Sequence, residues 1–251
     1  MERTTHRGRP FVAEGRAVLA GIHTVSANGA DSRPDVTARA ERWFRAARAE
    51  HASIASYARA ILELTAVGAP LDLLDATHQA LADQIRHARA CLTLAEAHAG
   101  TALAFGPLPA LSPRGGGLRR VALDTFEEGC VFETISAIEA ARAADDVDDA
   151  KSAADGDVSG AYRVRATLAR IADDEAAHAS LAWRTLAWAL AADGTGALRS
   201  EIAARADELR RAAFASRSTE RADGEDEKDA ARTAWEKVIG PTLADLLGPA
   251  S

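Results

Sequence analysis

The chain has 251 residues, of which 47% are hydrophobic and 5% aromatic, and its formal net charge is -7. This charge disfavours nucleic acid and anionic lipid as partners, and two cysteines are too few for the disulfide framework of a small secreted protein. No apolar run approaches the length of a membrane span. Because the sequence is rich in alanine and poor in proline, we expect an all-α protein of the cytoplasm.

The first part of the chain predicts a tail followed by a helical hairpin. Residues 1–37 lack a helical period and contain scattered Gly, Arg, Asn and Pro, which indicates an extended or poorly ordered N-terminal tail. Apolar residues then recur every three or four positions and predict a helix over 37–66. Residues 67–70 form a short stop signal, and a second helix over 71–99 completes an antiparallel hairpin.

A long connection and a second hairpin follow. Residues 100–117 contain three prolines and five glycines, which indicates a connection without helix. This connection is longer than a helical hairpin needs, so it could run the length of a helix bundle. Helices over 118–144 and 161–192 form the second hairpin, with an acidic loop between them. We therefore expect a bundle domain over 38–193 and a helical extension over 194–251 that packs on it.

Polar side chains interrupt the apolar stripe of each of the four helices. The first and third stripes contain Glu50 and Glu133. The second and fourth stripes each contain a side-chain oxygen donor three residues before a histidine, as the pairs Gln84/His87 and Glu175/His178. Residues three apart on a helix are surface neighbours, so each pair can hold one ion from adjacent turns.

These side chains are expected at one level of the bundle. Glu50 precedes the first turn by about as many residues as Gln84 and His87 follow it, and Glu133 and Glu175 flank the second loop at comparable distances. Buried carboxylates without a counter-charge are costly, and cations would supply that charge. One Glu-x-x-His pair in an alanine-rich helix often arises by chance, but two pairs with two interior glutamates predict a metal site.

Glu127 and Glu128 compete with Glu133 for the ligand position on the third helix. With regular α-helical spacing, Glu128 lies well off the inward face of that helix. We therefore expect Glu127 and Glu128 to be a solvated pair.

The order and spacing of these residues resemble the ferritin-like di-iron carboxylate superfamily, in which Glu, Glu-x-x-His, Glu and a second Glu-x-x-His lie on successive helices. The resemblance covers about residues 39–192. It implies a ferritin/rubrerythrin-like four-helix bundle, two antiparallel hairpins joined by a long crossover, that binds two Fe ions or a manganese or mixed pair. The ligands that it implies are Glu50, Gln84, His87, Glu133, Glu175 and His178.

Each histidine pair is also preceded by an aspartate. In some oxygen-activating members of the superfamily, such an aspartate accepts a hydrogen bond from the histidine of the other pair. The resemblance thus implies that Asp83 holds His178 and that Asp174 holds His87, each fixing the tautomer of a ring.

Gln84 departs from the superfamily, where the matching residue is ordinarily Glu. Only three carboxylates then face two divalent cations, so one position should be weak or should take an extra anion. A single-metal site at Glu133, Glu175 and His178 therefore stays open.

Two classes of function agree with these residues. The first is an oxidoreductase, an oxidase or hydroxylase, whose metals activate O2 or peroxide to oxidise a small-molecule substrate with help from an electron donor. The second is an iron-binding protein of the ferroxidase type, or a structural bundle that binds one metal ion or none. The alanine-rich interior leaves room for a substrate channel, which favours the enzyme. We expect no membrane partner, and a homodimer stays open.

Overall fold

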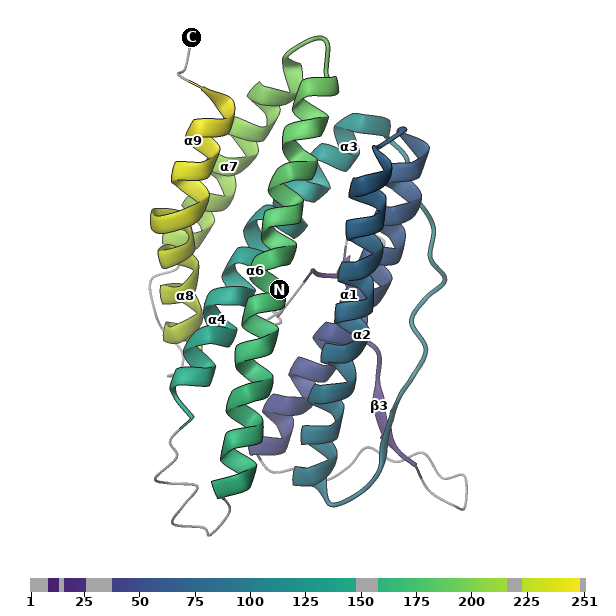
Figure 1. Cartoon of the computed structure of the whole chain (residues 1–251), viewed down its shortest axis with the longest axis vertical. Helices are drawn as coiled ribbons and strands as arrows, with labels where there is room; N and C mark the ends of the chain where they lie inside the picture. Colours follow the sequence, from purple (N-terminus) through teal and green to yellow (C-terminus); the bar gives the residue numbers. More distant parts are fainter. Residues whose placement is uncertain (1–8, 14–15, 26–37, 148–157, 216–222, 249–251) are drawn as a thin grey trace. The chain divides into compact units, whose positions relative to one another are not determined.

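The computed structural model describes residues 9–13, 16–25, 38–147, 158–215 and 223–248, and these residues are mostly helical (Figure 1). The prediction of an all-α protein is thereby confirmed. The chain divides into two compact units, one made of residues 1–65 and 70–113 and the other of residues 66–69 and 114–251. Much of the predicted tail, at 1–8, 14–15 and 26–37, lies outside the described residues.

The first unit is built on two long helices, α1 (Ala38–Ala66) and α2 (Leu71–Ala99), whose bounds agree with the predicted hairpin. Pro70 precedes α2, and Gly100 ends it in the left-handed conformation with a φ of 67°. Glycine adopts this conformation without steric cost, so the sequence stops the helix at the expected place.

Short strands accompany this hairpin. Strands β1 (Val12–Ala13) and β2 (Arg16–Ala17) pair antiparallel, and β3 (Ile22–Thr24) pairs antiparallel with β4 (Leu103–Phe105) from the connection after α2. The N-terminal segment is bonded to α1, because Arg48 Nε donates to the Ala20 carbonyl at 2.6 Å and Arg59 Nη1 donates to that of Val12 at 2.7 Å. The described part of the predicted tail is therefore extended and packed.

The second unit begins with a helical run in three pieces, α3 (Gly117–Asp124), the π-helix η1 (Thr125–Glu133) and α4 (Thr134–Asp145). The sequence predicts this run as one α-helix, and the π-helical segment was not foreseen. Helix α6 (Val158–Ala192) packs along all three pieces. Gly129 of η1 faces Ala182 of α6, whereas the later residue Glu133 lies near the earlier residues Glu175 and His178. The two segments are therefore antiparallel.

The remaining elements are α7 (Ala197–Ala215), α8 (Asp223–Ala234), the π-helix η2 (Trp235–Ile239) and α9 (Gly240–Leu247) (Figure 1). They share a core with η1 and α6, in which Phe126, Leu186 and Ile202 are buried with Trp235. Burial of these apolar side chains is the main contribution that holds the C-terminal helices to the unit.

Candidate metal centre

Three predicted ligands meet inside the second unit. Glu133 is the last residue of η1, and Glu175 and His178 lie one turn apart on α6. One ligand atom from each side chain lies within 4.8 Å of the other two. The exposed fractions of Glu133, Glu175 and His178 are 0%, 1% and 3%, so the group is fully inside the protein.

The spacing between these donors suits a shared cation better than a hydrogen bond. His178 Nδ1 and Glu175 Oε1 are 3.7 Å apart, beyond the roughly 3.2 Å limit of an ordinary hydrogen bond. Two ligands that each lie about 2.1 Å from one ion can be up to about 4.2 Å apart. Small movements of these side chains would therefore be enough to bring both onto one metal ion.

A close helix contact sets the distance between η1 and α6. Gly129 faces Ala182, which lies one turn beyond His178, and a Cβ atom on Gly129 would be 2.5 Å from the Cβ of Ala182. No larger residue fits at position 129 without moving a helix. This glycine therefore allows the approach that brings Glu133 to Glu175 and His178 of α6.

The first unit holds a second set of predicted ligands. Glu50 lies on α1, and Gln84 and His87 lie one turn apart on α2. His87 Nδ1 and Glu50 Oε2 are 3.5 Å apart, and all three side chains are buried. The hairpin brings Glu50 and His87 together because each lies about four turns from the connection between the helices.

Both sets have the donor chemistry of a transition-metal site. Carboxylate oxygen and imidazole nitrogen suit iron, manganese and zinc. Two carboxylates in the core are costly unless positive charge accompanies them, and a divalent cation balances two. The set on η1 and α6 has the two carboxylates of Glu133 and Glu175, whose charge one divalent cation would balance. The set on α1 and α2 has the single carboxylate of Glu50. The convergence of all six residues on one centre stays a prediction.

The two aspartates predicted to hold the histidines are half-buried. Asp83 forms an ion pair with Arg86 of the same helix, and Asp174 Oδ2 lies 4.0 Å from Arg170 Nε. The exposed fractions of the two aspartate side chains are 21% and 23%. Their bonds to His178 and His87 stay predictions.

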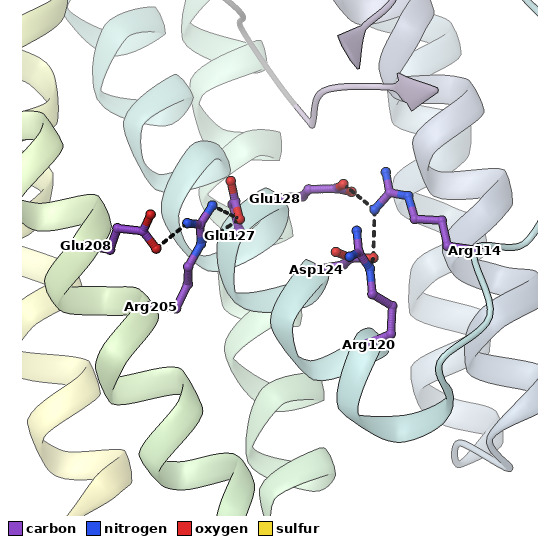
Figure 2. Close-up of polar contacts among 7 residues, drawn as sticks. All are labelled: Arg114, Arg120, Asp124, Glu127, Glu128, Arg205 and Glu208. Atoms are coloured by element: carbon purple, nitrogen blue, oxygen red, sulfur yellow. Dashed lines mark hydrogen bonds and ion pairs between the residues drawn. The ribbon is translucent and has the colours of Figure 1, made fainter. Parts of the chain in front are cut away.

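The expectation that Glu127 and Glu128 form a solvated pair is wrong for Glu128. Glu128 is buried, and its Oε1 accepts a hydrogen bond from Arg114 Nη1 at 2.8 Å (Figure 2). The physical reason is the π-helix, whose bonds join residues five apart and bring Glu128 toward the face of Glu133. Glu127 is partly exposed and pairs with Arg205.

The π-helix and its arginine partners are the parts of the site that the sequence reading missed. Asp124, Glu128 and Glu133 follow one another at spacings of four and then five. The longer second interval is the signal that could have indicated a change of helix type.

Comparisons of the chain with protein-family models, with curated proteins and with solved structures gave no match. Within the part of the chain that the structure describes, no helix combines the length and the apolar character that crossing a membrane requires.

Proposed function

We propose that this protein is a ferritin-like dimetal-carboxylate protein, a four-helix bundle made of two hairpins that are joined by the long connection after α2. The observation that carries the proposal is the buried meeting of Glu133, Glu175 and His178, whose ligand atoms lie within 4.8 Å of one another. A carboxylate from one helix and a Glu-x-x-His pair from the next are the donor types of the resembled superfamily.

Each ligand set would hold one iron or manganese ion. Glu133, Glu175 and His178 would hold the first ion, and Glu50, Gln84 and His87 would hold the second. Bound Fe(II) would supply the electrons and Lewis acidity that activation of O2 or peroxide requires. The protein's own contribution is a fixed set of donors in buried surroundings, which exclude water and strengthen the electrostatic attraction to a cation.

The reaction class that we favour is oxidation or hydroxylation of a small substrate, with an external electron donor. The second candidate is an iron-binding, ferroxidase-type or structural protein with a single metal ion. Gln84 favours this second candidate, because an amide at a fully buried ligand position adds no negative charge to the α1 and α2 set.

Anaerobic titration of the apoprotein with Fe(II) tests metal binding. We expect at least one ion per chain in the wild type and loss of that ion in the isosteric variant Glu175→Gln. Two ions with coupled spins would support a dinuclear centre, and one ion with no coupling would support the single-metal candidate. A folded wild-type protein that takes up neither Fe(II) nor Mn(II) would overturn the proposal.

Oxygen consumption separates the two candidates. The Fe(II) protein is mixed with O2 in the presence and absence of ascorbate as electron donor. Repeated oxygen uptake that needs ascorbate and the intact ligand Glu175, while the iron stays bound to the protein, would support the oxidoreductase. A single stoichiometric oxidation of the bound iron would support the ferroxidase-type protein.

A further inference from the structure

Two arginines hold the beginning of the π-helix from different elements (Figure 2). Arg114, in the segment before α3, places Nη1 2.7 Å from Asp124 Oδ2 and 2.8 Å from Glu128 Oε1. Arg205 of α7 places Nε and Nη2 3.0 Å and 2.6 Å from Glu127 Oε2. Consecutive acidic residues of η1 are thus bound by arginines of separate segments.

Arg114 contacts Asp124 and Glu128, and the helix winding after Glu128 sets the direction in which the Glu133 side chain points. Asp124 and Glu128 lie four residues apart on one face, and Glu133 follows Glu128 by five. In an α-helix, five residues would turn Glu133 about 140° away from Glu128. The i to i+5 bonding of η1 reduces this angle, because a π-helix has more residues per turn than an α-helix. When Glu128 is held in place, the π-helical winding therefore determines where Glu133 points.

The segment around Arg114 is built to reach these acids. Gly115, Gly116 and Gly117 have φ values of 70°, 92° and 60°, a run of left-handed conformation that glycine alone adopts readily. The chain can turn sharply there, immediately after Arg114 and at the start of α3. Arg120, one turn into that helix, donates from Nε to the same Asp124 oxygen at 2.8 Å.

Arg114 is mostly buried, so its charge matters to the acids beside it. Burial alone would lower the pKa of Arg114, but the charges and hydrogen bonds of Glu128 and Asp124 outweigh burial and raise the pKa. The guanidinium is therefore charged throughout the accessible pH range. Hydrogen bonds between charged groups are the stronger kind, and loss of one partner leaves a buried carboxylate uncompensated.

We propose that Arg114 is a positioning residue that keeps η1 in its π-helical form and so directs Glu133 toward Glu175 and His178. The inference rests on the proposed function for the role of Glu133 as a ligand. The effect of Arg114 on the winding of η1 does not need the metal, so the apoprotein should show it.

Hydrogen exchange of the apoprotein tests the structural effect. We expect Arg114→Gln to speed amide exchange over residues 125–133 by at least roughly tenfold, since the charged hydrogen bonds to Asp124 and Glu128 are lost. Arg114→Lys, which keeps the charge but not the forked donors, should restore part of the protection. Arg119→Gln is the matched control, because Arg119 forms an exposed ion pair from α3 to Glu201 at 2.6 Å and does not contact η1 through that pair. Unchanged exchange in Arg114→Gln would overturn the inference.

Cobalt binding tests the effect on Glu133. We expect Arg114→Gln to bind Co(II) roughly tenfold more weakly, with a changed ligand-field spectrum, and Arg119→Gln to match the wild type. Faster exchange with an unchanged Co(II) affinity and spectrum would overturn the role in directing Glu133. If the wild type binds no Co(II), Fe(II) or Mn(II), the proposed function fails, and the exchange result still decides whether Arg114 holds the π-helix.

Discussion

The two sets of predicted ligands differ in charge, while their burial is nearly the same. Glu133, Glu175 and His178 combine two carboxylates with an imidazole, whereas the set on α1 and α2 combines Glu50 and His87 with the amide of Gln84. Attraction to a divalent cation grows with each carboxylate, and in a buried site screening by water is weak. Because burial is nearly equal, charge ranks the two sets, and the set on η1 and α6 should bind a divalent cation first.

The two sets also differ in how the backbone presents them. Regular α-helices carry Glu50, Gln84 and His87. In the other set, Glu133 depends on a π-helix, which is held by a glycine contact and by two arginines. The stronger predicted set is therefore the more sensitive to substitutions outside its ligands.

The largest effect is expected from removal of a carboxylate of the stronger set. Glu175→Gln should weaken Fe(II) or Mn(II) binding at that set by at least about 100-fold, because a charged ligand is replaced with a neutral one of the same shape. Isothermal titration with Mn(II) measures the change. Asp173→Asn, at an exposed position of the same helix, should leave the affinity unchanged. Equal affinities in Glu175→Gln and the wild type would contradict the ranking of the two sets.

The next effect concerns the glycine that brings η1 to α6. Gly129→Ala should destabilise the protein by about 1–3 kcal/mol, because the added methyl group would meet Ala182 at 2.5 Å. Urea unfolding measures the free energy, and the double variant Gly129→Ala/Ala182→Gly should recover part of it. Gly194→Ala is the control, since its Cβ would meet nothing within 4 Å. A Gly129→Ala protein as stable as the control would show that the contact is not tight.

Gln84→Glu should make the two sets more alike. The added carboxylate should raise the affinity for a second divalent ion about tenfold, and in the apoprotein it should lower the stability because another charge is buried. Metal counting and unfolding of both forms measure these opposite effects. An affinity gain with no loss of apoprotein stability would indicate that the new carboxylate is compensated by groups other than a metal.

The smallest effect is expected at Asp193, which lies outside both sets and contributes to the pH dependence of folding stability. The pKa of Asp193 is lowered from its ordinary 3.8, because the backbone N–H of Leu198 and then the Thr195 hydroxyl donate to the carboxylate. The stabilisation is present above pH 3.8 and is lost as the pH falls through the lower folded-state pKa. Asp193→Ala should be slightly less stable at pH 7, and acid titration of unfolding should show the difference vanish at low pH. A difference that persists in strong acid would contradict this origin.

Local patterns in the sequence predict the positions of the long helices and the residue types of the candidate ligands. Glu175 and His178 are neighbours because three-residue spacing on an α-helix makes them so, and the hairpin of α1 and α2 follows from a local stop signal at Gly68 and Pro70. The positions of Glu50 and Glu133 within apolar stripes also predict that both are interior groups, and both are buried. These features depend on short-range geometry, which is encoded locally.

Contacts between distant parts of the chain account for the π-helical winding of η1, the burial of Glu128 and the pairing of β3 with β4. A π-helix is rarely stable alone, and here it coincides with a contact to Ala182 and ion pairs from Arg114 and Arg205. The strands are two or three residues long, too short for an alternating pattern to emerge. In each case the stabilising contact comes from a residue distant along the chain, so the local periodicity of the sequence cannot predict it.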